Sequence, residues 1–151
     1  MSTLEASSVN IRRLVRSDID AVLVLDRRIG KAHHGVNYRD MVVSDPGGAL
    51  DLSFVAETEG RVIGSILARL IYLGVPFSEV CLIHGILVDP DYQQRGIGSR
   101  LIHALFDHCY TEEISPIRVL VGERDTRLNQ FFERLGFRRS TIVNYDKTTE
   151  S

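Results

Sequence analysis

The residues best suited to do chemistry lie between Gln93 and Ser99, in the stretch Gln-Gln-Arg-Gly-Ile-Gly-Ser. A mainly apolar run, residues 82–88, precedes them, and Asp89-Pro90-Asp91 ends that run because proline has no N–H to donate within a strand. After the loop, apolar residues recur at the spacing of one helix face: Leu101, Ile102, Leu105, Phe106 and Cys109. The pattern predicts a strand, a glycine loop and a helix in that order.

Glycines at the start of a helix suit the binding of an anion. Gly96 and Gly98 allow the backbone to come close to a ligand, while the unpaired N–H groups of the first helical turn and the positive end of the helix dipole face the same point. A phosphate is the usual ligand there. A purely structural turn is the alternative. The sequence favours the ligand, because helices normally begin at Ser, Thr, Asp or Asn and this one uses none of them.

Two common phosphate-binding loops do not match these residues. A Walker loop requires Gly-Lys-Ser/Thr, whereas the chain continues Gly98-Ser99-Arg100. A dinucleotide fingerprint requires a third glycine for close helix packing, where this chain has Leu101, and it usually opens a domain instead of lying past its middle. A third design therefore has to be considered.

The loop resembles the acyl-CoA pyrophosphate loop of the GNAT N-acetyltransferase superfamily. The match is Gln93-x-x-Gly96-x-Gly98, preceded by Leu87-Val88-Asp89-Pro90. A second match, residues 131–137 (Phe-Phe-Glu-Arg-Leu-Gly-Phe), is similar to the family's aromatic-x-x-Leu-Gly-Phe ending. The resemblance covers nearly the whole chain and implies transfer of an acetyl group from acetyl-CoA to a primary amine by direct attack on the thioester. The alternative is a module that binds acyl-CoA without catalysis.

The resemblance also implies which residues hold the cofactor. Backbone N–H groups of residues 95–99 would meet the pyrophosphate, the strand before the loop would pair with the pantetheine arm, and an N–H near Val88 would polarise the thioester carbonyl. The implied cofactor-binding residues are Ile86, Leu87, Val88, Gln93, Gln94, Arg95, Gly96, Ile97, Gly98, Ser99, Asp125 and Phe132. No metal ligand set is expected.

The position of the family's proton donor departs from the family pattern. In many members a tyrosine five residues before the Phe of Gly-Phe protonates the departing CoA thiolate, and this position is Phe132. A positioned acid is worth about 10²- to 10⁴-fold in rate, but a thiol with a pKa of about 8.5 can leave without one. Tyr145 is the first substitute and Tyr110 the second. The family's asparagine corresponds to Asp125, which is also a suitable helix cap.

A general base is needed mainly for a lysine-like amine, whose pKa of about 10.4 keeps it protonated; a protein N-terminus near 7.7–8.0 is partly deprotonated already. His84 and Glu79 are the candidates, followed by Glu123. A hydrogen-bonded histidine of the sheet and a solvated strand end are the alternatives for the first two. His84 shares side-chain parity with Ile86 and Val88, and Glu79 does not, although a bulge at Gly85 would change that relation.

Two further groups match less specific parts of the family. The residues His33, His34 and Tyr38 fall in the variable segment that covers the acceptor site, with an exposed loop as the alternative. The pair Arg138-Arg139 is expected to be solvated, with contact to the CoA 3′-phosphate as the alternative.

Composition indicates one globular domain, residues 1–151, with frayed tails at 1–8 and 147–151. The apolar share is 44%, the charged share is 25%, and no apolar run reaches the roughly 18 residues of a membrane span. A net charge of −2 argues against nucleic acid as a partner. Without a signal-like start, and with Cys81 and Cys109 in apolar patterns, we expect a cytoplasmic protein with two core thiols and no disulfide.

The elements expected around the loop give an α/β fold. They are strands at 9–16, 52–57, 61–72, 79–88, 117–121 and 137–145, and helices at 17–30, 38–43, 97–110 and 125–136. Ser17-x-x-Asp20 is a candidate capping box. The order is that of the GNAT fold: a mostly antiparallel sheet with a splayed parallel pair and helices on both faces. A homodimer through edge strands is possible in this fold.

Overall fold

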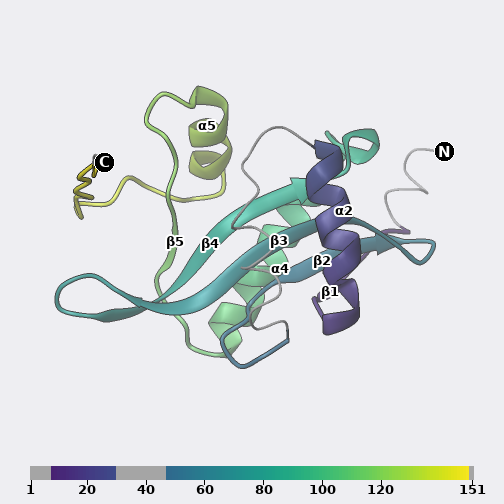
Figure 1. Ribbon diagram of the computed structural model, residues 1–151, viewed down its shortest axis with the longest axis horizontal. Coiled ribbons are helices and arrows are strands. Elements are labelled where there is room, and N and C mark those ends of the chain that lie inside the picture. The colour runs from purple at the N-terminus through teal and green to yellow at the C-terminus, as the bar shows by residue number, and fades with distance from the viewer. Residues whose placement is uncertain (1–7, 30–46, 150–151) are drawn as a thin grey trace. The chain divides into compact units, whose positions relative to one another are not determined.

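A five-stranded mixed sheet, in the order β1-β2-β3-β4-β5, forms the centre of the first of two units in the computed structural model (Figure 1). The structure describes residues 8–29 and 47–149. The units divide at residue 120, and each is described by itself. The strands are β1 (Asn10–Arg13), β2 (Phe54–Thr58), β3 (Arg61–Leu73), β4 (Ser78–Val88) and β5 (Ile117–Val119).

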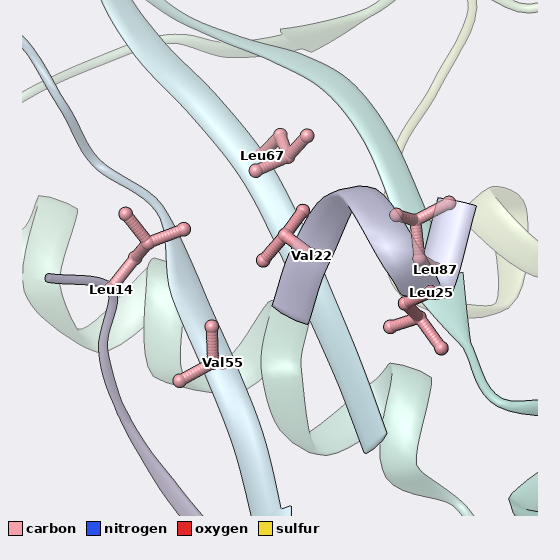
Figure 2. Packing of buried hydrophobic residues seen from close by; sticks show 6 residues of the cluster. All are labelled: Leu14, Val22, Leu25, Val55, Leu67 and Leu87. Carbon is pink, nitrogen blue, oxygen red and sulfur yellow. The ribbon is translucent and has the colours of Figure 1, made fainter. Parts of the chain in front are cut away.

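Two helices cover opposite faces of this sheet. Helix α2 (Ile19–Ile29) follows the short 3-10 helix η1 (Arg16–Asp18), and α4 (Ile97–Thr111) follows β4. Figure 2 shows Val22 and Leu25 of α2 directed at the sheet, in a cluster of buried residues completed by Leu14, Val55, Leu67 and Leu87. On the other face, Gly64 of β3 lies against Ile97 and Leu101 of α4. The predicted arrangement of helices on both faces is confirmed.

The antiparallel hairpin predicted from residues 52–72 is confirmed as β2 and β3. Its turn uses Glu59 and Gly60, both with positive φ (51° and 74°), as a tight hairpin requires. Strand β3 lies in the middle of the sheet and pairs on its other side with β4, also antiparallel. A strand that is apolar on both faces fits this place, because a helix covers each face.

The parallel pair β4–β5 is confirmed and is short. Cys81, Leu82 and Ile83 pair with Ile117, Arg118 and Val119. Strand β5 ends at Val119, two residues before its predicted end, whereas β4 continues to Val88. The outer edge of residues 84–88 therefore has no β5 partner. The mixed sheet with its splayed parallel pair agrees with the predicted fold class.

The first strand is shorter than the predicted residues 9–16, because an ion-pair network ends it. Arg12 donates to the buried carboxylate of Asp18 at 2.8 Å and to Glu57 of β2 at 3.0 Å, and Asp18 also accepts the N–H of Val15 at 2.8 Å. Burial alone raises the pKa of Asp18, but the bonds from Arg12 and Val15 outweigh it and lower the pKa. The N-cap of η1 is Val15, and the side chain that bonds back to its N–H is that of Asp18, so the bond expected from a capping box at Ser17 and Asp20 is made instead between Val15 and Asp18.

The described part of the second unit, residues 121–149, holds one helix, α5 (Thr126–Arg134), and the prediction of a strand at 137–145 is wrong. Residues 137–149 form no strand. The reason is local: Ser140 Oγ accepts the N–H of Ile142 at 2.9 Å, and the side chain of Asn144 donates to Asp146 at 2.9 Å. These local bonds compete with the backbone hydrogen bonds that pair one strand with another, and a strand also needs a neighbouring strand to pair with. Ile142, Val143 and Tyr145 are accordingly exposed.

The two cysteines are confirmed as free, buried thiols, on β4 and α4. They are neighbours: a hydrogen bond with Cys109 and burial together raise the pKa of Cys81 well above its ordinary value. The predicted helix at 38–43, its neighbours His33, His34 and Tyr38, and Gly30 lie outside the described residues. None of the helices within residues 8–29 and 47–149 has the length and apolar character needed to cross a membrane.

Candidate functional site

The candidate site begins where β4 ends. Asp89 follows the strand, is only 3% exposed, and directs the chain into the 3-10 helix η2 (Pro90–Tyr92). Its N–H donates to the carbonyl of Ile63 at 2.8 Å, its carboxylate accepts the N–H of Asp91 at 2.9 Å, and its carbonyl accepts the N–H of Tyr92 at 2.8 Å. These bonds turn the chain off the sheet and toward the glycine loop.

The glycine loop, residues 93–96, lies exposed between η2 and α4. Gln94 and Gly96 both have positive φ, 64° and 78°. The residue that precedes α4 is Gly96, and no side chain caps the helix. Gln94 costs about 1–3 kcal/mol in this conformation, and strain of this kind tends to cluster at functional sites. The first-turn N–H groups of Ile97, Gly98 and Ser99 thus meet no capping side chain, as the sequence predicts.

A glycine in β3 brings the start of α4 close to the sheet. A Cβ on Gly64 would lie 3.2 Å from the carbonyl oxygen of Leu87 and 3.4 Å from side-chain atoms of Ile97 and Leu101. A side chain at this position would push the first turn of α4 away from the end of β4. The sequence signal for this contact is an isolated glycine in an otherwise apolar strand, which often marks close backbone approach.

Positive charge gathers beside the loop. The guanidinium groups of Arg61 and Arg95 lie 5.8 and 5.2 Å from the ring centre of Tyr92, and Arg61 also donates to the Tyr92 hydroxyl at 3.3 Å. Cation–π contacts of this kind hold exposed arginines in place. Two guanidinium groups are thus held at Tyr92, the residue that immediately precedes the loop.

The end of β4 joins the loop through a second contact. The side-chain amide of Gln93 donates to the carbonyl of Val88 at 3.0 Å. Ile86, Leu87 and Val88 pair with Ile66, Ser65 and Gly64 of β3, so only the outer edge of this segment lacks a β5 partner. An extended chain with amide groups can pair with such an edge, as the pantetheine arm of CoA does in the resemblance.

His84 is the extra residue of a β-bulge in β4. Leu67 and Ala68 of β3 pair with Gly85 and Ile83, which leaves His84 without a partner of its own. Ile83 and Ile86 pair with Ala68 and Ile66, so they lie on one face, and the bulge interrupts the alternation of side chains at His84. The predicted parity of His84 with Ile86 and Val88 assumed a regular strand, and the bulge beside Gly85 removes that assumption, as expected for a bulge at this point.

The surroundings of His84 favour its neutral form. Partial removal from water, followed by the positive charge of Arg69, lowers the pKa of His84 below its ordinary value of 6.5. A neutral imidazole has a lone pair that can accept a proton at neutral pH. His84 is therefore chemically suited to act as a base.

Glu79 does not lie with His84. It pairs with Tyr72 near the start of β4, on the face of Cys81 and Ile86, and it is exposed. Four residues of extended strand lie between Glu79 and His84, so the two positions are roughly 15 Å apart. The structure therefore does not bring the two candidate bases together.

The remaining predicted residues lie mostly in the second unit. Asp125 caps α5, as predicted, by accepting the N–H of Leu128 at 3.2 Å. Phe132 is buried, and its ring makes edge contacts with Phe131 and Phe137, each at 5.2 Å. Tyr145 is 91% exposed, and Tyr110, on α4, is 88% exposed. The carboxylate of Glu123 lies 3.8 Å from Arg139, so this arginine has an ion-pair partner.

Sequence reasoning missed three residues around the loop: Arg28, Gly64 and Tyr92. Gly64 carried a signal, as noted above. Arg28 forms ion pairs with Asp89 and Asp91 across more than 60 residues of sequence, which no local pattern can indicate. Within residues 8–29 and 47–149, no group of three or more His, Cys, Asp or Glu side chains is arranged to hold a metal ion.

Relatives of known sequence include amine acetyltransferases. Over 141 residues the chain is 23% identical to the [ribosomal protein bS18]-alanine N-acetyltransferase of Escherichia coli K12, with 93% of this chain and 88% of that protein covered. Over 91 residues it is 31% identical to an uncharacterized N-acetyltransferase of Methanocaldococcus jannaschii; this match covers 60% of the chain and spans 40% of the archaeal protein.

Solved structures with the same fold include aminoglycoside acetyltransferases. AAC(6′)-Ih of Acinetobacter baumannii superposes with a TM-score of 0.75 at 21% identity, covering 95% of this chain and 99% of that one. AAC(6′)-Iy in complex with CoA gives 0.74 at 20% identity, covering 93% and 94%. At this identity the likeness shows the fold. A family model described as Acetyltransferase (GNAT) family matches residues 26–137, which is well over half of the chain and includes the glycine loop. The chain belongs to the GNAT acetyltransferase family, as its loop sequence predicts.

Proposed function

We propose that this protein transfers an acetyl group from acetyl-CoA to a primary amine. The observation that carries the proposal is the exposed glycine loop at the uncapped start of α4, in a chain of this family. Acetyl-CoA supplies the activated acetyl thioester. The residues Arg95, Gly96, Ile97, Gly98 and Ser99 offer N–H groups to its diphosphate, and Gln93 and Gln94 shape the loop. The outer edge of residues 86–88 is available to its pantetheine arm.

His84 is our first choice for the base. An ammonium acceptor must lose a proton before its nitrogen can attack the thioester carbonyl, and a neutral His84 can take that proton. The C–N bond then forms, the C–S bond breaks, and the second proton of the amine goes to the departing sulfur. Glu79 and Tyr145 remain candidates for proton transfer, and Asp125 and Phe132 remain the residues that the family pattern assigns to the sulfur end of the cofactor.

A module that binds acyl-CoA without catalysis is the second candidate function. The observation that favours it is Phe132, which is buried among two other phenylalanine rings and has no proton to give. Such a module would keep the loop of residues 93–99 and bind CoA. It would release no thiol with any acceptor.

The test is thiol release from acetyl-CoA with a panel of amines, run beside calorimetric titration with CoA. The panel contains an aminoglycoside, a polyamine, free lysine and a peptide with an N-terminal alanine. We expect CoA binding and turnover with at least one amine. Binding without turnover on any acceptor would favour the module, and no binding of CoA would reject both functions.

The pH profile tests the role of His84. Because the pKa of His84 lies below 6.5, we expect kcat/KM of the wild type to fall as the pH drops below 6.5 and His84 becomes protonated. We expect this fall to be absent in His84→Gln. An unchanged profile would reject His84 as the base. We further propose a cytoplasmic location, which fractionation of cells can test, and a homodimer, which size-exclusion chromatography with light scattering can test.

A further inference from the structure

The carboxylate of Asp89 is a buried charge at the junction between β4 and the glycine loop. Its side chain is 4% exposed, and one of its oxygens accepts the N–H of Asp91 at 2.9 Å. Every backbone polar group of Asp89 is also bonded within the junction, as described above. Any movement of this side chain would therefore be transmitted to η2 and to the loop that follows.

The cation that balances this charge comes from α2. Arg28, in the last turn of the helix, places Nη1 3.2 Å from Asp89 Oδ2 and Nη2 3.4 Å from Asp91 Oδ2. One planar guanidinium thus contacts the carboxylates on both sides of Pro90. Arginine suits this task because its fork of donors is rigid, whereas lysine offers a single point charge.

We propose that Arg28 is a positioning residue for the cofactor: it holds Asp89 and Asp91, and through them sets the loop that meets the diphosphate of CoA. This inference rests on the proposed function, because it assumes that the loop binds CoA. In this role Arg28 needs no contact with the cofactor. It acts on the junction, and the junction fixes where the loop leaves the sheet.

The physical argument is the cost of an unbalanced buried carboxylate. Without Arg28, Asp89 keeps one hydrogen bond from Asp91 but loses its counter-charge in a place from which water is excluded. The carboxylate then turns toward solvent, where water can replace the lost counter-charge. Turning out breaks the Asp91 bond and loosens η2, so the loop amides lose their common direction. Arg28 is 44% exposed, which moderates the effect.

The experiment compares Arg28→Met with Arg27→Met. Arg27 lies in the same helical turn, is exposed, and forms no ion pair with any residue that the structure describes, so its variant removes one positive charge without touching Asp89. We expect Arg28→Met to weaken CoA binding about tenfold and to raise the KM for acetyl-CoA similarly, with kcat and the acceptor KM nearly unchanged. The affinity of Arg28→Lys for CoA should lie between those of Arg28→Met and the wild type, and Arg27→Met should bind CoA as the wild type does.

A rescue separates this role from general stabilisation. Asn at position 89 can still accept the Asp91 N–H but carries no charge, so Arg28→Met should have little further effect in an Asp89→Asn background. The inference is overturned if folded Arg28→Met binds CoA like the wild type, or if it weakens binding tenfold in the Asp89→Asn background as well. The double variant decides the matter if Arg28→Met does not fold. Failure of the wild-type protein to bind CoA would instead remove the proposed function.

Discussion

The helices α4 and α5 begin in opposite ways. Helix α5 starts at Asp125, whose carboxylate accepts the N–H of Leu128. Helix α4 starts at Gly96, in a left-handed conformation and with no capping side chain. Of these two helices, only α4 follows a loop that contains residues of positive φ, Gln94 and Gly96, and this loop is exposed. The start of α5 is therefore stabilised by a side chain of the protein, whereas the start of α4 leaves its N–H groups without a capping side chain.

The burial of each helix explains why α4 can do without a cap. Its 15 residues include five that are buried, Ile97, Leu101, Ile102, Leu105 and Cys109, whereas the nine residues of α5 include one, Phe132. Burying one large apolar side chain contributes about 1.5–3 kcal/mol, and a cap contributes about 1 kcal/mol. Packing therefore dominates the stability of α4, and its first turn is free to serve a ligand.

The largest effect is expected from placing a negative charge at the open helix start. Gly96→Asp puts a carboxylate where the diphosphate of CoA would lie, and two like charges about 4 Å apart interact by roughly 4 kcal/mol at an effective dielectric of 20. Allowing for screening, we expect CoA to bind about 100-fold more weakly, as measured by calorimetry. Gly96→Asn is the matched control, because it has the same shape, tolerates the left-handed conformation and carries no charge.

The comparison between Asp and Asn at position 96 isolates charge from backbone strain. We expect Gly96→Asn to lose less than about tenfold in affinity, since the strain of a non-glycine residue at this φ costs roughly 1 kcal/mol. Equal affinities of the two variants for CoA would contradict the view that the start of α4 receives an anion.

The next effect concerns the contact that brings α4 to the sheet. Gly64→Val would force side-chain atoms against Leu87, Ile97 and Leu101, and overpacking of this kind costs about 1–3 kcal/mol. We expect a lower free energy of unfolding in urea and several-fold weaker CoA binding. Gly122→Ala, ahead of α5, is the control, because a Cβ there meets nothing within 4 Å. Equal losses in the two variants would argue that the close approach of α4 is unimportant.

The sequence predicts the open helix start well because its signals are local. Pro90, Gly96, Gly98 and the apolar period of α4 all fall within about 20 residues, so the strand, loop and helix follow from neighbouring residues alone. The capping of α5 by Asp125 was predictable for the same reason. The hairpin of β2 and β3 also rests on one turn and two apolar strands.

What the sequence could not predict depends on partners distant along the chain. The bulge at His84 exists only in the register with β3, and the Arg28–Asp89 pair joins α2 to the end of β4. The expected strand at 137–145 has the right residue types, but strands need a partner, and the bonds made by Ser140 and Asn144 satisfy the chain locally. The prediction of this strand relied on local residue preferences, whereas a strand forms only where a distant segment pairs with it.

A smaller effect is expected at the capped helix. Asp125→Ala should lower the free energy of unfolding by about 1 kcal/mol through loss of the Leu128 bond, and Asp125→Ser, which can cap, should restore most of it. Hydrogen exchange of the α5 amides is the most direct readout. We expect Asp125→Ser to bind CoA within about twofold of the wild type, because the carboxylate serves the helix. A large loss of affinity in this capped variant would instead support the family assignment of Asp125 to the cofactor.

The smallest effect is a dependence on pH that only the first unit should show. His108, near the end of α4, lies 3.2 Å from the Arg13 guanidinium, and burial followed by the charge of Arg13 lowers its pKa below 6.5. The unfolded chain then binds a proton more readily, so the contribution is present above pH 6.5 and is lost as the pH falls below it. We expect His108 to contribute less than about 1 kcal/mol to the free energy of unfolding, because its side chain is partly solvated. Residues 121–151 contain no histidine. The free energy of unfolding in urea should therefore vary less with pH between 5.5 and 7 in His108→Gln than in the wild type, the part due to His84 remaining, with no matching change in the exchange of the α5 amides. If the stability of the variant and of the wild type depended equally on pH, the contact between His108 and Arg13 would not contribute to the pH dependence.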